Sequence, residues 1–163
     1  MKNLVFIGLM VFVPGCTRDE NSVEGLMQKL ESEEASDRVA AVSVLKTYGP
    51  EAEPAVDALS KTLADSDPAV RVGAGYALAA IGPEAAPALP ALIRALKDAD
   101  AEVRLAAAYA IPAISAPDDS AIPILEAALD DSDPRVQTEA ALAIRKLQLA
   151  AKHRNHGSSP TAN

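Results

Sequence analysis

Side chains that could carry out chemistry are few in this sequence, and most of them stand in short acidic phrases. Asp-x-Asp pairs occur in DSDP at 65–68 and 131–134 and in KDADAE at 97–102. Such carboxylates could bind calcium, but the phrases lack the further oxygen ligands and the glycine of a calcium loop, whereas capping of a following helix accounts for them. His153 and His156 have the spacing of a weak metal pair without a third ligand, so we expect no metal site.

The sequence contains nothing that resembles an active site. It has no Ser-His-Asp set and no glycine-rich phosphate loop, and both of its histidines follow residue 151. The formal net charge of −8 argues against a nucleic-acid partner, because phosphate binding needs a basic face. We therefore expect a noncatalytic protein without cofactors; neither its partner nor its oligomeric state can be read from the residues.

A repeat with a period of 33 positions orders most of the chain. Arg71 and Arg104 are 33 positions apart, and the same shift relates Asp65, Asp98 and Asp131 without gaps. Apolar positions and Gly-Pro turns repeat with the same period: Leu63, Leu96 and Leu129; Val70, Val103 and Val136; Gly49-Pro50 and Gly82-Pro83. A fixed period of this size is the signature of a solenoid.

Each period contains two amphipathic helical patterns. Apolar residues recur at spacings of three and four over 87–97 and again over 101–114, with an Asp turn between them and a Gly-Pro turn after them. We call the two helices of each repeat helix A and helix B. The sequence predicts an all-α protein, an α-solenoid of about four helix-turn-helix repeats at 22–48, 49–81, 82–114 and 115–151. With 3% aromatic residues and no Trp, the core must consist of Ala, Leu, Val and Ile.

The phrase Asp-x-Asp-x-x-Val-Arg followed by small residues and Ile-Gly resembles the second half of a HEAT repeat, in a short bacterial version. The resemblance implies that helix B forms the inner, concave layer. It also implies a hydrogen-bonded ladder between neighbouring repeats, in which Arg71 and Arg104 have a structural role with Asp65 and Asp98 as partners. Both ends depart from this pattern, as capping repeats do, because Ser32 accompanies Arg38 and Gln137 accompanies Asp131.

Residues 1–16 form a segment outside the repeat, with Lys2 before a run of ten apolar residues at 4–13. Ten residues are too few to span a bilayer as a helix but fit a secretory signal. The ending Val-Pro-Gly-Cys resembles a bacterial lipobox, which makes Cys16 the candidate for lipidation, although Pro14 is unusual there. We expect residues 17–21 to be a tether and residues 152–163 a disordered tail.

Seven side chains point away from the predicted core on the helical wheels of successive B helices. They are Val39, Val42, Val72, Tyr76, Leu105, Tyr109 and Leu142. Two interpretations remain open at this point. These residues could bind a partner, because tyrosines are enriched at binding hot spots, or they could pack against adjacent B helices across small Ala and Gly side chains.

The sequence thus favours a protein–protein interaction scaffold at the bacterial cell envelope, held at the membrane by a lipidated N-terminus. Secretion into the periplasm without a lipid anchor is an alternative localisation. One alternative is an accessory subunit of an enzyme, since related HEAT-like repeats occur in bilin lyase subunits. Another is a cytoplasmic adaptor whose N-terminus only looks like a signal.

Overall fold

The computed structural model describes residues 20–115 and 119–157, and within these ranges it contains helices and turns without a strand. The α-helices are α1 (Val23–Lys29), α2 (Ala35–Tyr48), α3 (Val56–Thr62), α4 (Pro68–Ile81), α5 (Leu89–Ala95), α6 (Ala101–Ser115), α7 (Ile122–Glu126) and α8 (Pro134–Gly157). Short 3₁₀ helices stand at Gly49–Ala55, Gly82–Ala88, Asp119–Ala121 and Ala127–Asp130. The predicted all-α solenoid is confirmed.

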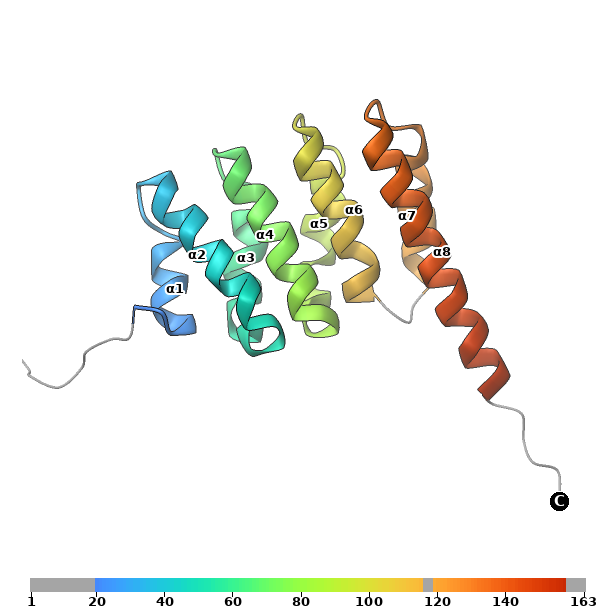
Figure 1. The fold of residues 1–163 in the computed structure, drawn as a ribbon, viewed down its shortest axis with the longest axis horizontal. Helices are drawn as coiled ribbons and strands as arrows, with labels where there is room; N and C mark the ends of the chain where they lie inside the picture. The colour runs from blue at the N-terminus through green and yellow to red at the C-terminus, as the bar shows by residue number, and fades with distance from the viewer. Residues whose placement is uncertain (1–19, 116–118, 158–163) are drawn as a thin grey trace, which may run out of the picture.

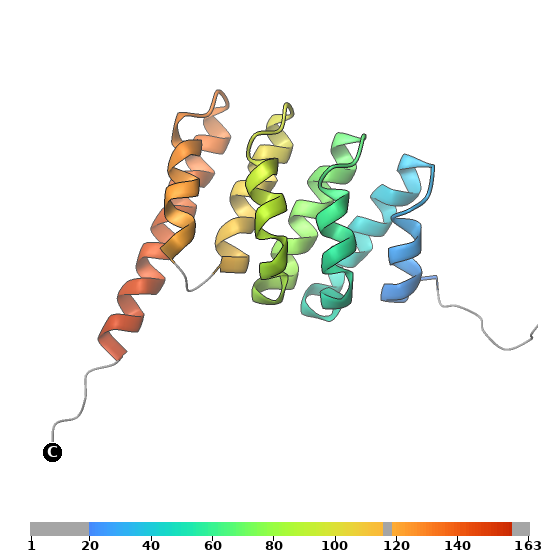
Figure 2. The same cartoon turned by 180° about the vertical axis from the view of Figure 1, so that it is seen from behind.

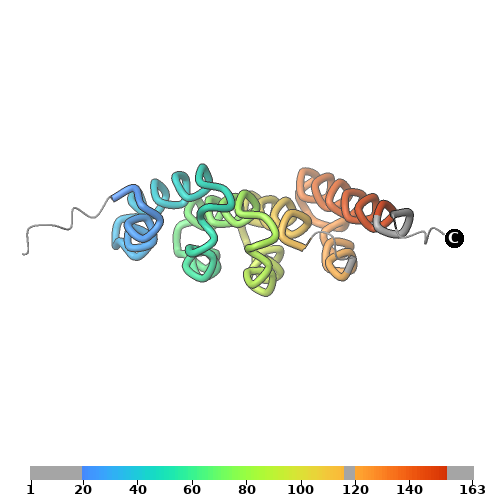
Figure 3. Tube along the Cα trace, turned by 90° about the horizontal axis from the view of Figure 1, so that it is seen from below, coloured from blue at the N-terminus to red at the C-terminus, as the bar shows by residue number. Residues whose placement is uncertain are grey.

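The helices form two rows. The B helices α2, α4, α6 and α8 lie side by side in chain order (Figure 1), and the A helices α1, α3, α5 and α7 form the second row behind them (Figure 2). Seen from below, the rows are separate layers, and the B helices follow the inner side of a shallow curve (Figure 3). The side chains that helix B turns away from helix A therefore lie on one continuous inner surface.

The core repeats with the sequence. Leu26, Leu59, Leu92 and Leu125 stand 33 positions apart on successive A helices, and each is at most 1% exposed. Leu45, Leu78 and Ile111 occupy one equivalent position on the B helices and are fully buried. Because each repeat covers the apolar side of the next, stability in this architecture depends on the contacts between neighbours.

Local sequence signals set the ends of the helices. Asp67 is the N-cap of α4, where its carboxylate accepts a hydrogen bond from the Ala69 N–H at 2.8 Å, and Pro68 occupies the first helical position. At the other end Gly82 has φ +84°, a conformation that glycine adopts without steric cost. The Gly-Pro turns that follow α2 and α4 are seven-residue 3₁₀ helices, whereas the sequence predicted only turns there.

The stretch Pro68–Ala95 passes a length and composition test for a membrane-spanning helix, applied to the described residues. It consists, however, of α4, a 3₁₀ turn and α5, which belong to two different rows. Its apolar side chains, among them Val70, Leu78 and Leu92, are buried in the solenoid. The core of two adjacent repeats accounts for its hydropathy.

The predictions for the two ends of the chain have different outcomes. The predicted signal at 1–16, Cys16 included, lies outside the described residues, as does most of the tether. At the other end α8 continues to Gly157, so residues 152–157 are helical where we expected a disordered tail. The reason is local, because the run Ala150, Ala151 and Lys152 has high helix propensity and no glycine or proline interrupts it before Gly157.

Candidate functional site

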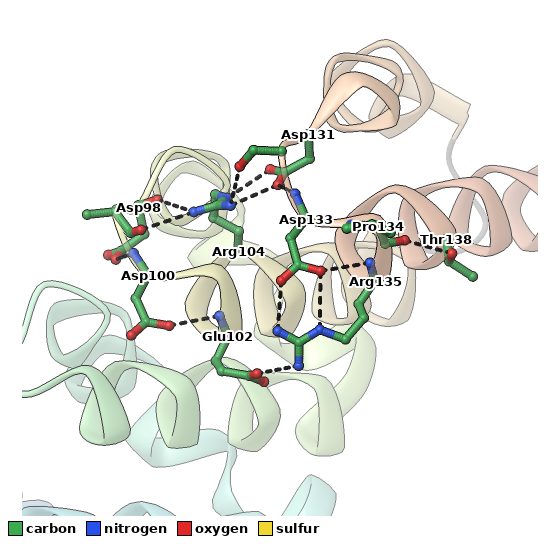
Figure 4. Close-up of polar contacts among 11 residues, drawn as sticks. Asp98, Asp100, Glu102, Arg104, Asp131, Asp133, Pro134, Arg135 and Thr138 are labelled. Carbon is green, nitrogen blue, oxygen red and sulfur yellow. Dashed lines mark hydrogen bonds and ion pairs between the residues drawn. The ribbon is translucent and has the colours of Figure 1, made fainter.

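A ladder of arginine–aspartate pairs joins successive repeats along one edge of the B helices. Arg38 donates from Nε and Nη2 to the two carboxylate oxygens of Asp65 at 2.7 and 2.8 Å. Arg104 binds Asp131 in the same way, with both distances 2.8 Å (Figure 4). Arg71 makes one such bond, from Nη2 to Asp98 at 2.9 Å. Each arginine therefore holds the turn aspartate of the following repeat.

The same arginines also hold the turns of their own repeats. The third guanidinium nitrogen, Nη1, donates to main-chain carbonyl oxygens of the preceding turn: Arg38 to Ser32 at 2.9 Å, Arg71 to Asp65 at 2.8 Å, and Arg104 to Asp98 at 2.9 Å. The prediction that Arg71 pairs with Asp65 and Arg104 with Asp98 is therefore wrong for the carboxylates, because these arginines bind only the carbonyl oxygens of those aspartates. These aspartates offer a backbone oxygen to the arginine of their own repeat and their carboxylate to the arginine before it.

The two aspartates of each turn have separate tasks. The first accepts from the backbone N–H two residues later, as Asp98 does from Asp100 at 2.8 Å, and this bond holds its carboxylate toward the preceding repeat. The second caps helix B, as Asp100 does by accepting from the Glu102 N–H at 2.8 Å. The capping interpretation of the Asp-x-Asp phrases is confirmed.

The ladder aspartates are kept ionised by their surroundings. The hydrogen bonds from Arg38 and Arg104 lower the pKa of Asp65 and Asp131, against a desolvation that raises it. For Asp98 burial is the largest influence and raises the pKa, but the bonds from Arg71 and from the Asp100 N–H together lower it. The pairs are largely shielded from water, since the side chains of Arg104 and Asp131 are 12% and 9% exposed.

The departures from the ladder at both ends have a structural reason. Ser32 Oγ accepts from the Glu34 N–H at 3.2 Å, as the first aspartate of the other turns does two residues ahead, but no repeat with an arginine precedes it in the described chain. Gln137 Nε2 donates to the Asp131 carbonyl at 2.6 Å, which reproduces the bond that an arginine makes to its own turn. Both residues keep the contact within the repeat and omit the contact between repeats.

The inner surface itself has three kinds of position. The first is a seam between B helices, formed by Val42, Gly75 and Ala108, which are all buried. Val42 is 1% exposed because Gly73 on α4 has no side chain, and a Cβ added there would lie 2.2 Å from Val42 Cγ2. Val42 therefore cannot contact a partner, and its inclusion among the candidates is corrected.

The second kind of position is half-buried. Val39, Val72 and Leu105 lie one turn before the outermost side chains and pack partly against the core. For these three residues, packing against neighbouring helices, the second interpretation of the sequence, explains why they are partly buried. They form the floor beneath the residues that face outward.

The third kind of position forms the inner row, by which we mean Tyr76, Tyr109 and Leu142 on α4, α6 and α8. Tyr109 is 50% exposed and Leu142 is 54% exposed, whereas Tyr76 is half-buried. The two tyrosine rings are in contact, with centroids 5.6 Å apart and planes inclined by 59°. Of the seven candidates from the sequence, Tyr109 and Leu142 are the two exposed ones.

Charged side chains surround the inner row. Burial raises the pKa of Tyr76, and the nearby carboxylates of Glu102 and Glu139 raise it further. Arg135 pairs with both Glu102 and Asp133, so its charge is already balanced (Figure 4). The ammonium of Lys46 lies over the Tyr76 ring, 5.3 Å from its centroid. The contact of Lys46 with a ring of the next repeat depends on tertiary structure, and nothing in the sequence indicated it.

The described residues lack a metal-binding cluster. They contain no group of three or more His, Cys, Asp or Glu side chains placed to hold a metal ion. The ladder carboxylates are occupied by arginines, and His153 is an exposed residue near the end of α8. The arrangement is suited to holding another macromolecule on an apolar strip with charged margins.

Comparison with known proteins agrees with this architecture. The HEAT repeat family matches residues 23–89 and 89–153. No curated protein sequence matches the chain. Among solved structures, an engineered protein from the Northeast Structural Genomics Consortium is similar with 27% sequence identity and a TM-score of 0.62, over 78% of this chain and 63% of its own length.

A second similar structure is the complex of CpcE and CpcF of phycocyanin lyase from Nostoc sp. PCC7120. It shares 24% sequence identity over 93% of this chain and 72% of the matched chain, with a TM-score of 0.53. At this identity the likeness extends to the fold, which many functions can share.

Proposed function

The chain belongs to the HEAT repeat family, and from that premise we propose that it is a noncatalytic scaffold that binds a partner protein on its inner surface. The inner row supports the proposal most directly. Tyr109 is 50% exposed and Leu142 is 54% exposed on this surface. Rigid aromatic side chains with a polar tip lose little entropy on binding and are typical of binding hot spots.

Capture by crosslinking tests this proposal. A photoreactive amino acid at position 109 should crosslink a partner from membrane extract, and the same group at Leu129, which is exposed outside the B-helix layer, should not. Replacing Tyr76 and Tyr109 together by Ala should abolish capture through a crosslinker placed at Leu142. Far-UV circular dichroism should meanwhile show unchanged helix content. Undiminished capture by the double variant would refute the proposal.

We further propose that the scaffold works at the cell envelope, anchored through a lipid on Cys16. The support is the sequence of the N-terminal segment, in which a short apolar run precedes Gly15-Cys16. Mass spectrometry of the mature protein tests the anchor. The proposal requires loss of residues 1–15 and a lipid adduct on Cys16, whereas an intact N-terminus would favour the cytoplasmic adaptor.

The accessory enzyme subunit remains the second candidate, because the fold similarity to CpcE and CpcF covers nearly the whole chain. Incubation with a tetrapyrrole separates the two functions. A subunit that handles bilins should change the absorbance of the added pigment, and a scaffold of the kind proposed above should leave it unchanged.

A further inference from the structure

The contact between Lys46 and Tyr76 shows how a cation sits on this surface. The Lys46 ammonium belongs to the first repeat and lies 5.3 Å from the centroid of a ring in the second repeat. A cation within about 6 Å of a ring centroid is attracted by the negative face of the π system. The inner row thus contains one aromatic ring that a basic side chain of the protein itself already covers.

The next ring along the row lacks this cover. Tyr109 is the equivalent of Tyr76 one repeat later, and the residue equivalent to Lys46 is Ala79. Alanine is too short to reach the ring, and among the described residues no cation lies over Tyr109. The difference is visible in exposure, since Tyr109 is 50% exposed and Tyr76 is half-buried.

A carboxylate on α8 lies near the inner row. Glu139 on α8 is the equivalent of Ala106 on α6, and Ala106 packs against Gly75, the residue before Tyr76. By repeat equivalence Glu139 is expected opposite Ala108, the residue before Tyr109, and its carboxylate is near enough to the inner row to raise the pKa of Tyr76. In the part of the chain that the structure describes, Glu139 has no ion pair, whereas Glu102 is held by Arg135. The whole chain carries a net charge of −8, which favours a basic partner over an acidic one.

We propose that a lysine or arginine side chain of the partner protein lies on the open face of Tyr109, with Glu139 as its counterion. The partner would then repeat, between molecules, the contact that Lys46 makes within this one. This inference rests on the proposed function, because it names the chemistry of the contact at the same surface. An apolar or aromatic side chain at Tyr109 is the competing occupant.

A matched pair of peptides tests the inference on the full chain. The probes are acetyl-Leu-Arg-Leu-amide and acetyl-Leu-citrulline-Leu-amide, which have nearly the same shape and differ in charge. Labelled tyrosine rings are followed by NMR, and the chain has only three tyrosines, of which Tyr48 serves as the internal reference. The arginine peptide should shift the Tyr109 ring with an affinity about two- to five-fold higher than the citrulline peptide, as expected for an exposed cation–π contact.

Three variants establish the origin of this preference. Ala79→Lys should place the protein's own cation over Tyr109 and remove the preference for arginine, whereas the uncharged control Ala79→Gln should keep most of it. Glu139→Gln should reduce the preference. Equal affinity of the two peptides, no shift of the Tyr109 ring by either, or a preference that survives Ala79→Lys would overturn the inference.

Partner crosslinking distinguishes this failure from failure of the proposed function. If Ala79→Lys and Glu139→Gln leave capture unchanged while the double tyrosine variant abolishes it, the inner surface binds the partner but the cationic contact is wrong. If the double tyrosine variant also captures normally, the proposed function fails as well. Loss of capture in Ala79→Lys with capture intact in Ala79→Gln supports both.

Discussion

The contact between Arg104 and Asp131 should be a main source of coupling between the third and fourth repeats. The ends of the ladder suggest how to remove it without disturbing the turns. Arg104→Gln copies Gln137, which bonds to its own turn carbonyl at 2.6 Å and goes no further. Asp131→Ser copies Ser32, which accepts from the backbone two residues ahead. Each replacement keeps the contact within a repeat and deletes the contact between repeats.

The structure sets the size of the effect. Arg104 and Asp131 share two hydrogen bonds of 2.8 Å, and bonds between charged groups contribute about 1.5–3 kcal/mol each. The side chains are 12% and 9% exposed, so solvent screening removes only part of this sum. We expect either single replacement to lower the free energy of unfolding by about 2–4 kcal/mol, because each leaves a shielded charge without its partner. The double variant should cost about 1–3 kcal/mol less than the sum of the singles.

Urea unfolding followed by circular dichroism measures these energies. Gln137→Arg is the matched control, because in the described part of the chain no aspartate of a following repeat lies beside position 137, and it should change stability by less than about 0.5 kcal/mol. Weaker coupling should also broaden the transition, as the fourth repeat begins to unfold separately. A cost of Arg104→Gln no larger than that of the control, or single costs that simply add, would show that this pair does not couple the two repeats.

Three other predictions concern packing, pH and capping. Gly73→Ala should lower the free energy of unfolding in urea by about 1–3 kcal/mol, because the new methyl group clashes with Val42. The cost should be smaller in a Val42→Ala background. An equal cost in both backgrounds would contradict the close contact between Gly73 and Val42. The pKa values of Asp65 and Asp131 are lower in the folded than in the unfolded state, so their contribution to the free energy of unfolding is present above about pH 4 and is lost as the pH falls further. A free energy of unfolding that stays the same between about pH 7 and pH 3 would contradict this. Asp67→Ala should cost about 1 kcal/mol through loss of the α4 cap, measured by thermal unfolding against the exposed control Lys61→Ala.

The sequence alone determined the period, the order of the helices and the composition of the core. These follow from local rules, because apolar spacing defines one buried side of each helix and the Asp and Gly-Pro phrases define its ends. Repetition then strengthens every assignment, since positions such as Leu59 and Leu92 must have the same surroundings in each copy. The tertiary structure was not needed to predict an α-solenoid.

Which side chains meet across neighbouring repeats was decided only in three dimensions. The spacing of Asp65 and Arg71 indicates that they belong to one turn and helix, but not that the carboxylate belongs to Arg38. Likewise a helical wheel gives the direction of Val42 and not the distance to the next helix. That distance depends on the residue that faces Val42, which here is Gly73. Because glycine has no Cβ, α4 can pack closely against Val42 and bury it.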